Sequence, residues 1–223
     1  MRTIGAIHTA SPMVEPTKAL FAEHLPGVRL FNIADDSLIQ EVIRENTVTP
    51  AVRKRLISYY FAAVDAGADL IFNTCSSVGE VADAARDFLP VPMIQIDDAM
   101  TAKAVQEANT IAVLATLPTT LGPTVRRLLK QAASVGKDIR IIEGLAEGAF
   151  QAVISGDGQT HDRLILETAE QVSRQADLIV LAQGSMARME NVLTKQTGKK
   201  VLSSPLPGVL SVKEKIEQMS QSS

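Results

Sequence analysis

The sequence predicts an α/β fold made of two similar lobes, each a parallel four-stranded sheet flanked by helices. Two observations predict it. Short runs rich in Ile, Val and Leu alternate with longer segments of helical periodicity, which is typical of parallel strands covered by helices on both faces. In addition, ADLIFNTCSS (68–77) aligns without a gap on ADLIVLAQGS (176–185). A repeat of this kind indicates two copies of one structural unit in tandem.

Eight short apolar segments are the strand candidates, taken in order along the chain. They are residues 3–8, 28–33, 70–73, 93–96, 111–115, 139–143, 178–182 and 201–203. The repeat relates them, because residues 4–12 fall on 111–119 and residues 93–96 fall on 201–204, at offsets of 107 and 108 residues. Apolar strands resemble one another by composition alone, but a chance resemblance would not recur at nearly one offset.

The repeat divides the chain into a first lobe over about residues 1–100 and a second over about 105–205. At 223 residues the chain is long enough for each lobe to bury a core. Residues 209–219 carry Lys and Glu at helical spacing, and we expect a helix there that packs back on the first lobe.

Composition excludes several classes of partner. The net charge is −3 and the basic residues are scattered, which argues against nucleic acid binding. Aromatic residues are 4% with no Trp, so stacking platforms are scarce. No apolar run approaches the roughly 20 residues of a membrane span, and the first residues lack a signal peptide, so we expect a cytoplasmic protein without membrane contact. The oligomeric state stays open between a monomer and a homo-oligomer.

Standard cofactor and hydrolase motifs are absent. The glycines fit neither a dinucleotide fingerprint nor a P-loop, and no G-x-S-x-G elbow is present. The three histidines, at positions 8, 24 and 161, lack metal-ligand spacing, and His161 is expected at the surface. The pairs Asp35/Asp36 and Asp97/Asp98 are interpreted as caps and turn residues. We therefore expect neither a nucleotide cofactor nor a metal.

Ser and Thr gather in four turns that follow predicted strands, at residues 8–12, 73–77, 115–120 and 182–186. In parallel sheets, ligands bind beyond the carboxyl ends of the strands. Each hydroxyl alone is explained as well by capping of the next helix. Four such turns related by a repeat favour one shared site in a cleft between the lobes.

Cys75 is the only cysteine, so it forms no intrachain disulfide. It follows the strand at 70–73 and precedes a helical segment that begins near Val78. A helix N-terminus lowers the pKa of a thiol and stabilises the thiolate, which is both a base and a nucleophile. A lone cysteine is often a small buried hydrophobe, but the polar setting NTCSS favours chemistry.

The segments NTCSSVGE, LAQGSM, ATLPTTLGPT and SSPLPGV together resemble the aspartate/glutamate racemase superfamily, which includes hydantoin racemases, maleate isomerases and arylmalonate decarboxylases. The resemblance covers nearly the whole chain and is specific for the superfamily rather than for one reaction. It implies a cofactor-independent enzyme of two pseudo-symmetric lobes, with a cysteine from each flanking a small carboxylate substrate.

Cys75 matches the first-lobe cysteine of that superfamily, and Gln183 stands where the second belongs. Racemisation by two bases needs a titratable group on each face of the carbon, and an amide does not titrate usefully. Gln183 is instead expected to hydrogen-bond a carboxylate or enediolate oxygen. The chemistry left to a single thiol is protonation of a carbanion after decarboxylation, addition to a double bond, or proton transfer on one face.

The resemblance also implies the remaining site residues. Glutamate racemases carry an acidic Asp-Ser pair in the first turn, whereas this chain has His8, Thr9, Ala10 and Ser11, which favours a hydroxy, keto or plain carboxylic acid over an amino acid. His8 is a secondary acid/base candidate. The predicted substrate-binding residues are Thr9, Ser11, Asn73, Ser76, Ser77, Thr116, Thr119, Thr120, Gly184 and Ser185.

The sequence therefore predicts a cofactor-independent isomerase or lyase that acts on a small carboxylic acid through Cys75. The alternative is a ligand-binding or regulatory protein that kept the fold after losing catalysis together with the second cysteine.

Overall fold

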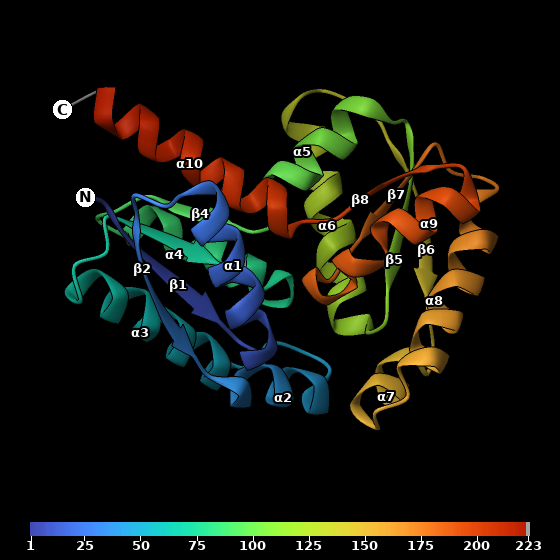
Figure 1. Cartoon of the computed structure of the whole chain (residues 1–223), viewed down its shortest axis with the longest axis horizontal. Coiled ribbons are helices and arrows are strands. Elements are labelled where there is room, and N and C mark those ends of the chain that lie inside the picture. The colour runs from blue at the N-terminus through green and yellow to red at the C-terminus, as the bar shows by residue number, and fades with distance from the viewer. Residues whose placement is uncertain (222–223) are drawn as a thin grey trace. The chain divides into compact units, whose positions relative to one another are not determined.

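The computed structural model describes residues 1–221, which form two compact units. Unit 1 comprises residues 1–99 and the segment from Pro205 onward, and unit 2 comprises residues 100–204. Figure 1 shows the chain coloured from its N-terminus in blue to its C-terminus in red. None of the helices within the described 221 residues combines the length and apolar composition that crossing a bilayer requires.

Unit 1 is built from four strands and their covering helices. Its strands are β1 (Thr3–His8), β2 (Arg29–Ala34), β3 (Leu70–Asn73) and β4 (Met93–Gln95). Its α-helices are α1 (Val14–His24), α2 (Asp36–Glu45), α3 (Pro50–Asp65), α4 (Gly79–Ala85) and α10 (Pro205–Gln221). Short 3-10 helices lie at η1 (Ser11–Met13), η2 (Ser76–Val78) and η3 (Arg86–Phe88).

Unit 2 repeats this arrangement. Its strands are β5 (Thr110–Ala115), β6 (Arg140–Leu145), β7 (Leu178–Leu181) and β8 (Lys200–Leu202). Its α-helices are α5 (Asp98–Glu107), α6 (Pro118–Ser134), α7 (Ala149–Ile154), α8 (Gly158–Ser173) and α9 (Glu190–Thr197), and the 3-10 helix η4 (Gly184–Met189) follows β7.

The two sheets have the same topology. Their strand orders are β2-β1-β3-β4 and β6-β5-β7-β8, and every pair is parallel. The registers correspond as well, since Ile4 pairs with Leu70 where Ile111 pairs with Leu178. The predicted α/β fold with two four-stranded parallel sheets is confirmed. All eight strands lie within two residues of their predicted bounds.

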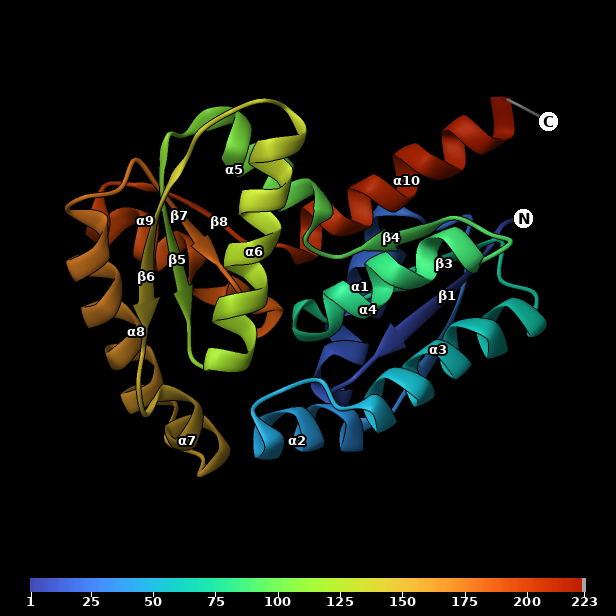
Figure 2. The same cartoon turned by 180° about the vertical axis from the view of Figure 1, so that it is seen from behind.

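Alternation along the strands of unit 1 divides its core into two layers. Ile4, Ala6, Leu70 and Phe72 face α1 and α10, whereas Ile7 and Ile71 face α2, α3 and α4. Figures 1 and 2 show these helices on opposite faces of the sheet. Because both faces are covered, the strands are mostly apolar, which is why they were recognisable in the sequence.

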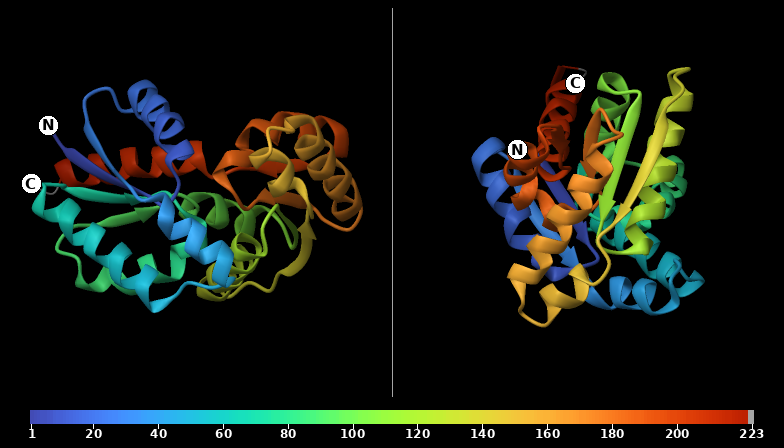
Figure 3. Two further views of the ribbon diagram at one scale, coloured as in Figure 1. Left: turned by 90° about the horizontal axis from the view of Figure 1, so that it is seen from below. Right: turned by 90° about the vertical axis from the view of Figure 1, so that its right-hand side faces the viewer.

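Unit 2 is layered in the same way. One face of its sheet packs on α5 and α6 through Ile111, Val113 and Val180, and the other packs on α7, α8 and α9 through Leu114 and Ile179. The two views of Figure 3 show α8 lying along this sheet.

Two helices cover a sheet other than the one they follow. Helix α5 comes directly after β4 of unit 1, but most of it belongs to unit 2, where Met100, Ala104 and Val105 enter the core. Helix α10 comes after β8 of unit 2 but packs against α1 and β4 of unit 1 through Val209 and Val212. Figure 3 shows α10, in red, alongside the strands of unit 1.

Candidate functional site

Polar residues gather at the carboxyl end of each sheet, because β1 and β3 pair side by side in unit 1 and β5 and β7 do so in unit 2. This pairing brings Thr9 to Cys75 in unit 1 and Thr116 to Gln183 in unit 2. Each unit therefore has its own cluster of predicted site residues.

The Cys75 sulfur lies at the start of η2 and receives several hydrogen bonds. The Thr9 hydroxyl, the backbone N–H groups of Ser77 and Val78, and the Ser77 side chain all interact with it. Cys75 itself is partly exposed, while Ser76 and Ser77 are buried. Donors from two strand ends thus converge on the thiol, and each of them favours its ionised form.

Burial nevertheless dominates, and it raises the pKa of the Cys75 thiol above the ordinary value against the lowering effect of these donors. The expectation that a helix N-terminus lowers this pKa is wrong in its net direction. The physical reason is that desolvation disfavours the thiolate, while η2 and the seven-residue α4 add only a short helix to oppose it. At neutral pH the resting group is therefore the thiol.

His8 lies in the interior of unit 1 with no exposed surface. Its Nε2 is 2.9 Å from Asn32 Oδ1, and its Nδ1 is 2.9 Å from Thr74 Oγ1. Burial lowers the pKa of His8, and the hydrogen bond with Asn32 partly offsets this. Both ring nitrogens are thus engaged within the protein, in an imidazole that is neutral at physiological pH.

Asn73 is also fully buried. Its Oδ1 accepts a hydrogen bond of 3.0 Å from the Tyr60 hydroxyl, and its Nδ2 donates one of 3.1 Å to the Cys75 carbonyl oxygen. The amide that was predicted to bind substrate is thereby used at both ends inside unit 1.

A carboxylate lies at the turn of residues 8–12, although it belongs to α2. Ser11, exposed at the start of η1, donates its backbone N–H and its hydroxyl to Asp36, the hydroxyl at 2.6 Å. The sequence led us to interpret Asp35 and Asp36 as caps and turn residues. That is confirmed for Asp35, which accepts from the Ser37 N–H at 3.0 Å at the start of α2, but Asp36 was missed as a member of the first turn.

In unit 2 the orientation of the Gln183 amide follows from its partner. Its side-chain oxygen lies 2.7 Å from the backbone nitrogen of Thr116 and 3.0 Å from the Thr116 hydroxyl. A backbone N–H can only donate, so the atom that faces it must be the carbonyl oxygen. Gln183 is a partly exposed residue, and its NH₂ end is consequently directed away from Thr116 as a hydrogen-bond donor.

The other predicted residues of unit 2 lie at the starts of α6 and η4. The Thr119 hydroxyl is buried and has no hydrogen-bond partner within the described chain, and Thr120 is buried beside it. Gly184 is the first residue of η4, and Ser185 after it is exposed.

His161 is buried, with 5% of its surface exposed, so the expectation of a surface residue is wrong. Its Nδ1 lies 2.7 Å from Asp162 and 3.1 Å from Arg188, a residue of η4. Arg188 also pairs with Asp162, and this guanidinium holds the pKa of the Asp162 carboxyl below its ordinary value. This contact ties α8 to the turn after Gln183, and no local pattern in the sequence signals it.

Among residues 1–221, no group of three or more His, Cys, Asp or Glu side chains is arranged to hold a metal ion. The polar clusters at the two sheet ends instead combine hydroxyls, amides and backbone N–H groups with one thiol. Such groups bind carboxylate oxygens and can transfer a proton.

The sequence was compared with models of known protein families. A family model described as Asp/Glu/Hydantoin racemase matches residues 7–209 of the chain. None of the curated proteins matches the sequence significantly.

Several solved structures share the fold. Glutamate racemase from Francisella tularensis subsp. tularensis SCHU S4, in complex with D-glutamate, superimposes with a TM-score of 0.77 at 14% identity, covering 98% of this chain and 82% of that one. Allantoin racemase from Klebsiella pneumoniae gives 0.72 at 21% identity, with 98% and 89% covered. Unliganded arylmalonate decarboxylase gives 0.57 at 15% identity, with 96% and 92% covered. At these identities the likeness shows the fold alone.

Proposed function

Because this chain belongs to the Asp/Glu/hydantoin racemase family, we propose that it is a cofactor-independent isomerase or lyase that acts on a small carboxylic acid. The observation that carries the proposal is the Cys75 thiol, to which the Thr9 hydroxyl and the N–H groups of Ser77 and Val78 donate. These donors would stabilise the thiolate as it forms, which is what a group that releases and recovers a proton needs.

Cys75 would act first as an acid. Its pKa is raised, so at neutral pH the sulfur carries a proton that it can give to a carbanionic carbon of the substrate. The S–H bond breaks, a C–H bond forms, and the thiolate left behind is held by the surrounding donors until solvent returns a proton. The same step would complete a decarboxylation or one half of an isomerisation.

Gln183 would serve as a donor rather than as a second base. With its carbonyl oxygen engaged by Thr116, the NH₂ group offers hydrogen bonds to a carboxylate or enediolate oxygen. An amide cannot take a proton from the opposite face of a carbon, which disfavours racemisation by two bases. The glutamate racemase in the comparison binds D-glutamate, which supports a small carboxylate as the ligand class.

The replacement of a second thiol by Gln183 also favours a second candidate, a protein that binds a carboxylate without turning it over. The two differ in the fate of the hydrogen on the substrate carbon. Incubation with hydroxy, amino, malonic and unsaturated dicarboxylic acids in deuterated water, followed by NMR, distinguishes exchange or product formation from binding alone.

The decisive variant is Cys75→Ala. It should abolish turnover of any substrate found in this panel while circular dichroism shows an unchanged fold, because no other thiol is present. Ser155→Ala, which removes an exposed hydroxyl after α7, is the matched control and should keep wild-type activity. Full activity in Cys75→Ala would refute the catalytic role.

A further inference from the structure

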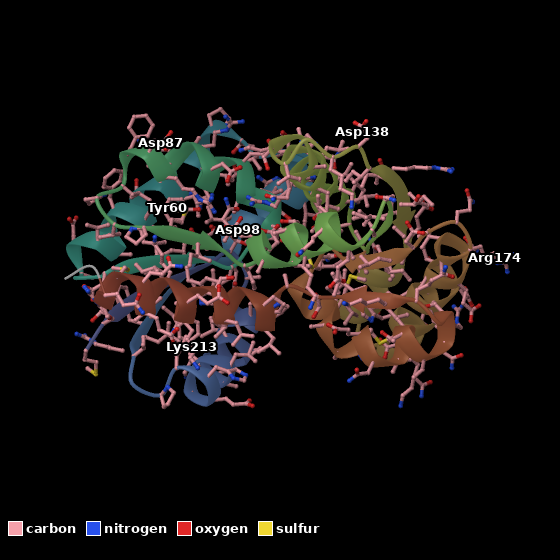
Figure 4. The ribbon with its side chains drawn as sticks, turned by 90° about the horizontal axis from the view of Figure 1, so that it is seen from above. Tyr60, Asp87, Asp98, Asp138, Arg174 and Lys213 are labelled. Atoms are coloured by element: carbon pink, nitrogen blue, oxygen red, sulfur yellow. The ribbon has the colours of Figure 1, made fainter. Side chains whose placement is uncertain are left out.

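The turn that carries Cys75 is held from inside unit 1 by two hydrogen bonds that the proposed chemistry does not use. Tyr60, in the middle of α3, donates from its hydroxyl to Asn73 Oδ1 at 3.0 Å, and Asn73 Nδ2 donates to the Cys75 carbonyl oxygen at 3.1 Å. Tyr60 and Asn73 are both 0% exposed. Figure 4 labels Tyr60 among the side chains of unit 1.

The Cys75 carbonyl determines which atom donates and which accepts in both hydrogen bonds. The Cys75 carbonyl oxygen can only accept, so the amide atom that faces it must be the nitrogen. The amide oxygen then faces Tyr60, which must supply a proton. A buried bond of this kind is costly to leave unmade, because neither Asn73 nor Tyr60 can turn to water instead.

The internal repeat shows that this arrangement is particular to the lobe with the thiol. Helix α3 corresponds to α8 at an offset of 108 residues. In the repeat, Thr168 is therefore equivalent to Tyr60, and Leu181 is equivalent to Asn73. Thr168 bonds within its own helix, to the Leu164 carbonyl at 2.8 Å, and Leu181 has no polar side chain. The chain of bonds is present where the strand end carries Cys75 and absent where it carries Gln183.

We propose that Tyr60 is a positioning residue for Cys75, acting through the Asn73 amide to hold the turn in which the thiol meets the N–H groups of Ser77 and Val78. The inference rests on the proposed function, in which that thiol moves a proton. Fixing the Cys75 carbonyl fixes the peptide plane that follows it. The N–H groups of Ser77 and Val78, which follow this peptide plane, are thereby aimed at the sulfur.

Three titratable groups act electrostatically on the Tyr60 hydroxyl: Cys75 itself, then Arg86 on η3 and Asp83 on α4. Arg86 pairs with Asp98, and Asp83 accepts from Gln95 at 2.6 Å. Burial raises the pKa of Tyr60 well above its ordinary value, so the hydroxyl keeps its proton at neutral pH.

The test titrates the thiol directly and needs no substrate. Thiolate absorbance in the ultraviolet is followed against pH, with the Cys75→Ala form of each variant as its blank, since the chain has a single cysteine. Tyr60→Phe should raise the Cys75 pKa by about half a pH unit or more, which lowers the thiolate fraction about threefold below that pKa.

Tyr59→Phe is the matched control, because it deletes the neighbouring hydroxyl, which donates to Asp35 at 2.7 Å. It should leave the thiol titration unchanged. The double variant Tyr60→Phe/Asn73→Leu covers the case in which Tyr60→Phe does not fold, since it leaves no polar side-chain atom of either residue unpaired and removes only the donor to the Cys75 carbonyl. It should raise the Cys75 pKa as well.

An unchanged or lowered Cys75 pKa in the folded Tyr60→Phe or double variant would overturn the inference, as would an equal shift in Tyr59→Phe. Failure of the proposed function gives a different result. In that case the thiol titration shifts as expected, while Cys75→Ala retains turnover or the wild-type protein has none.

Discussion

The Gln183 side-chain oxygen accepts two hydrogen bonds from one residue, the backbone N–H of Thr116 at 2.7 Å and its hydroxyl at 3.0 Å. This contact joins the ends of β5 and β7. It takes up the accepting end of the amide and directs the donating end away from Thr116, so the turn after β7 presents N–H groups where a second thiol is expected from the family resemblance.

Gln183→Glu should therefore weaken the binding of carboxylate ligands. One carboxylate oxygen can still accept from Thr116, but the other replaces the NH₂ donor by a negative charge. Loss of a hydrogen bond to a charged ligand predicts a dissociation constant about tenfold to hundredfold higher, measured by calorimetry with a carboxylate that the wild type binds. Gln175→Glu makes the same change on the exposed surface of unit 2 and should leave binding unaltered. Equal affinities in the wild type, Gln183→Glu and Gln175→Glu would show that Gln183 does not bind the carboxylate.

The buried His8 should make unit 1 sensitive to acid. Burial depresses its pKa in the folded protein, so its contribution to stability is present above the unfolded pKa and is lost as the pH falls through the folded one. Urea unfolding between pH 7 and pH 5 should show a fall in the free energy of unfolding that His8→Gln lacks. His24→Gln, at the partly exposed end of α1, should keep the wild-type slope, and a parallel slope for His8→Gln would contradict the assignment.

Cys75 should have the corresponding effect at alkaline pH. Its folded pKa is raised, so stability is fully present below the unfolded thiol pKa and is lost as the pH rises through the folded value. The free energy of unfolding of the wild type should decline over this alkaline window, and Cys75→Ala should decline less. Chemical unfolding at several alkaline pH values under reducing conditions measures the difference, which disappears if the thiol is not desolvated.

Gly208 should tolerate no side chain. A Cβ at this position of α10 would lie 2.6 Å from the backbone oxygen of Ile96, so the helix would have to move away from the sheet of unit 1. Such overpacking costs about 1–3 kcal/mol of stability, which Gly208→Ala should show in thermal or urea unfolding. At Gly27 an added Cβ has no atom within 4 Å, so Gly27→Ala should be nearly neutral. Similar stability for the two variants would mean that α10 docks loosely.

The strands and their repeat were predictable because both faces of each sheet are covered, which makes β1, β3, β5 and β7 predominantly apolar. The polar strand ends were predictable for the same reason, since apolar sequence stops where the sheet does. Cys75 and Gln183 were found in this way.

The roles of individual side chains at these ends depend on contacts between distant segments. Alternation places Asn73 on the same face as Ile71, but its partner Tyr60 is identified only when α3 is docked. Asp36 reaches Ser11 across 25 residues, and the depth at which Cys75 lies is set by packing around it. Burial therefore reversed the expected pKa direction of the thiol.

Helices α5 and α10 each follow a strand of one unit and pack in the other, and this exchange affects the order in which the two units can fold. Residues 100–204 form a contiguous unit that has all its helices once they have been synthesised, whereas the β4 side of the first sheet lacks Val209 and Val212 until the last segment emerges. Domains usually fold during synthesis from the N-terminus onward. Here residues 100–204 can complete their core first, because one face of the first sheet is covered by α1 alone until α10 docks.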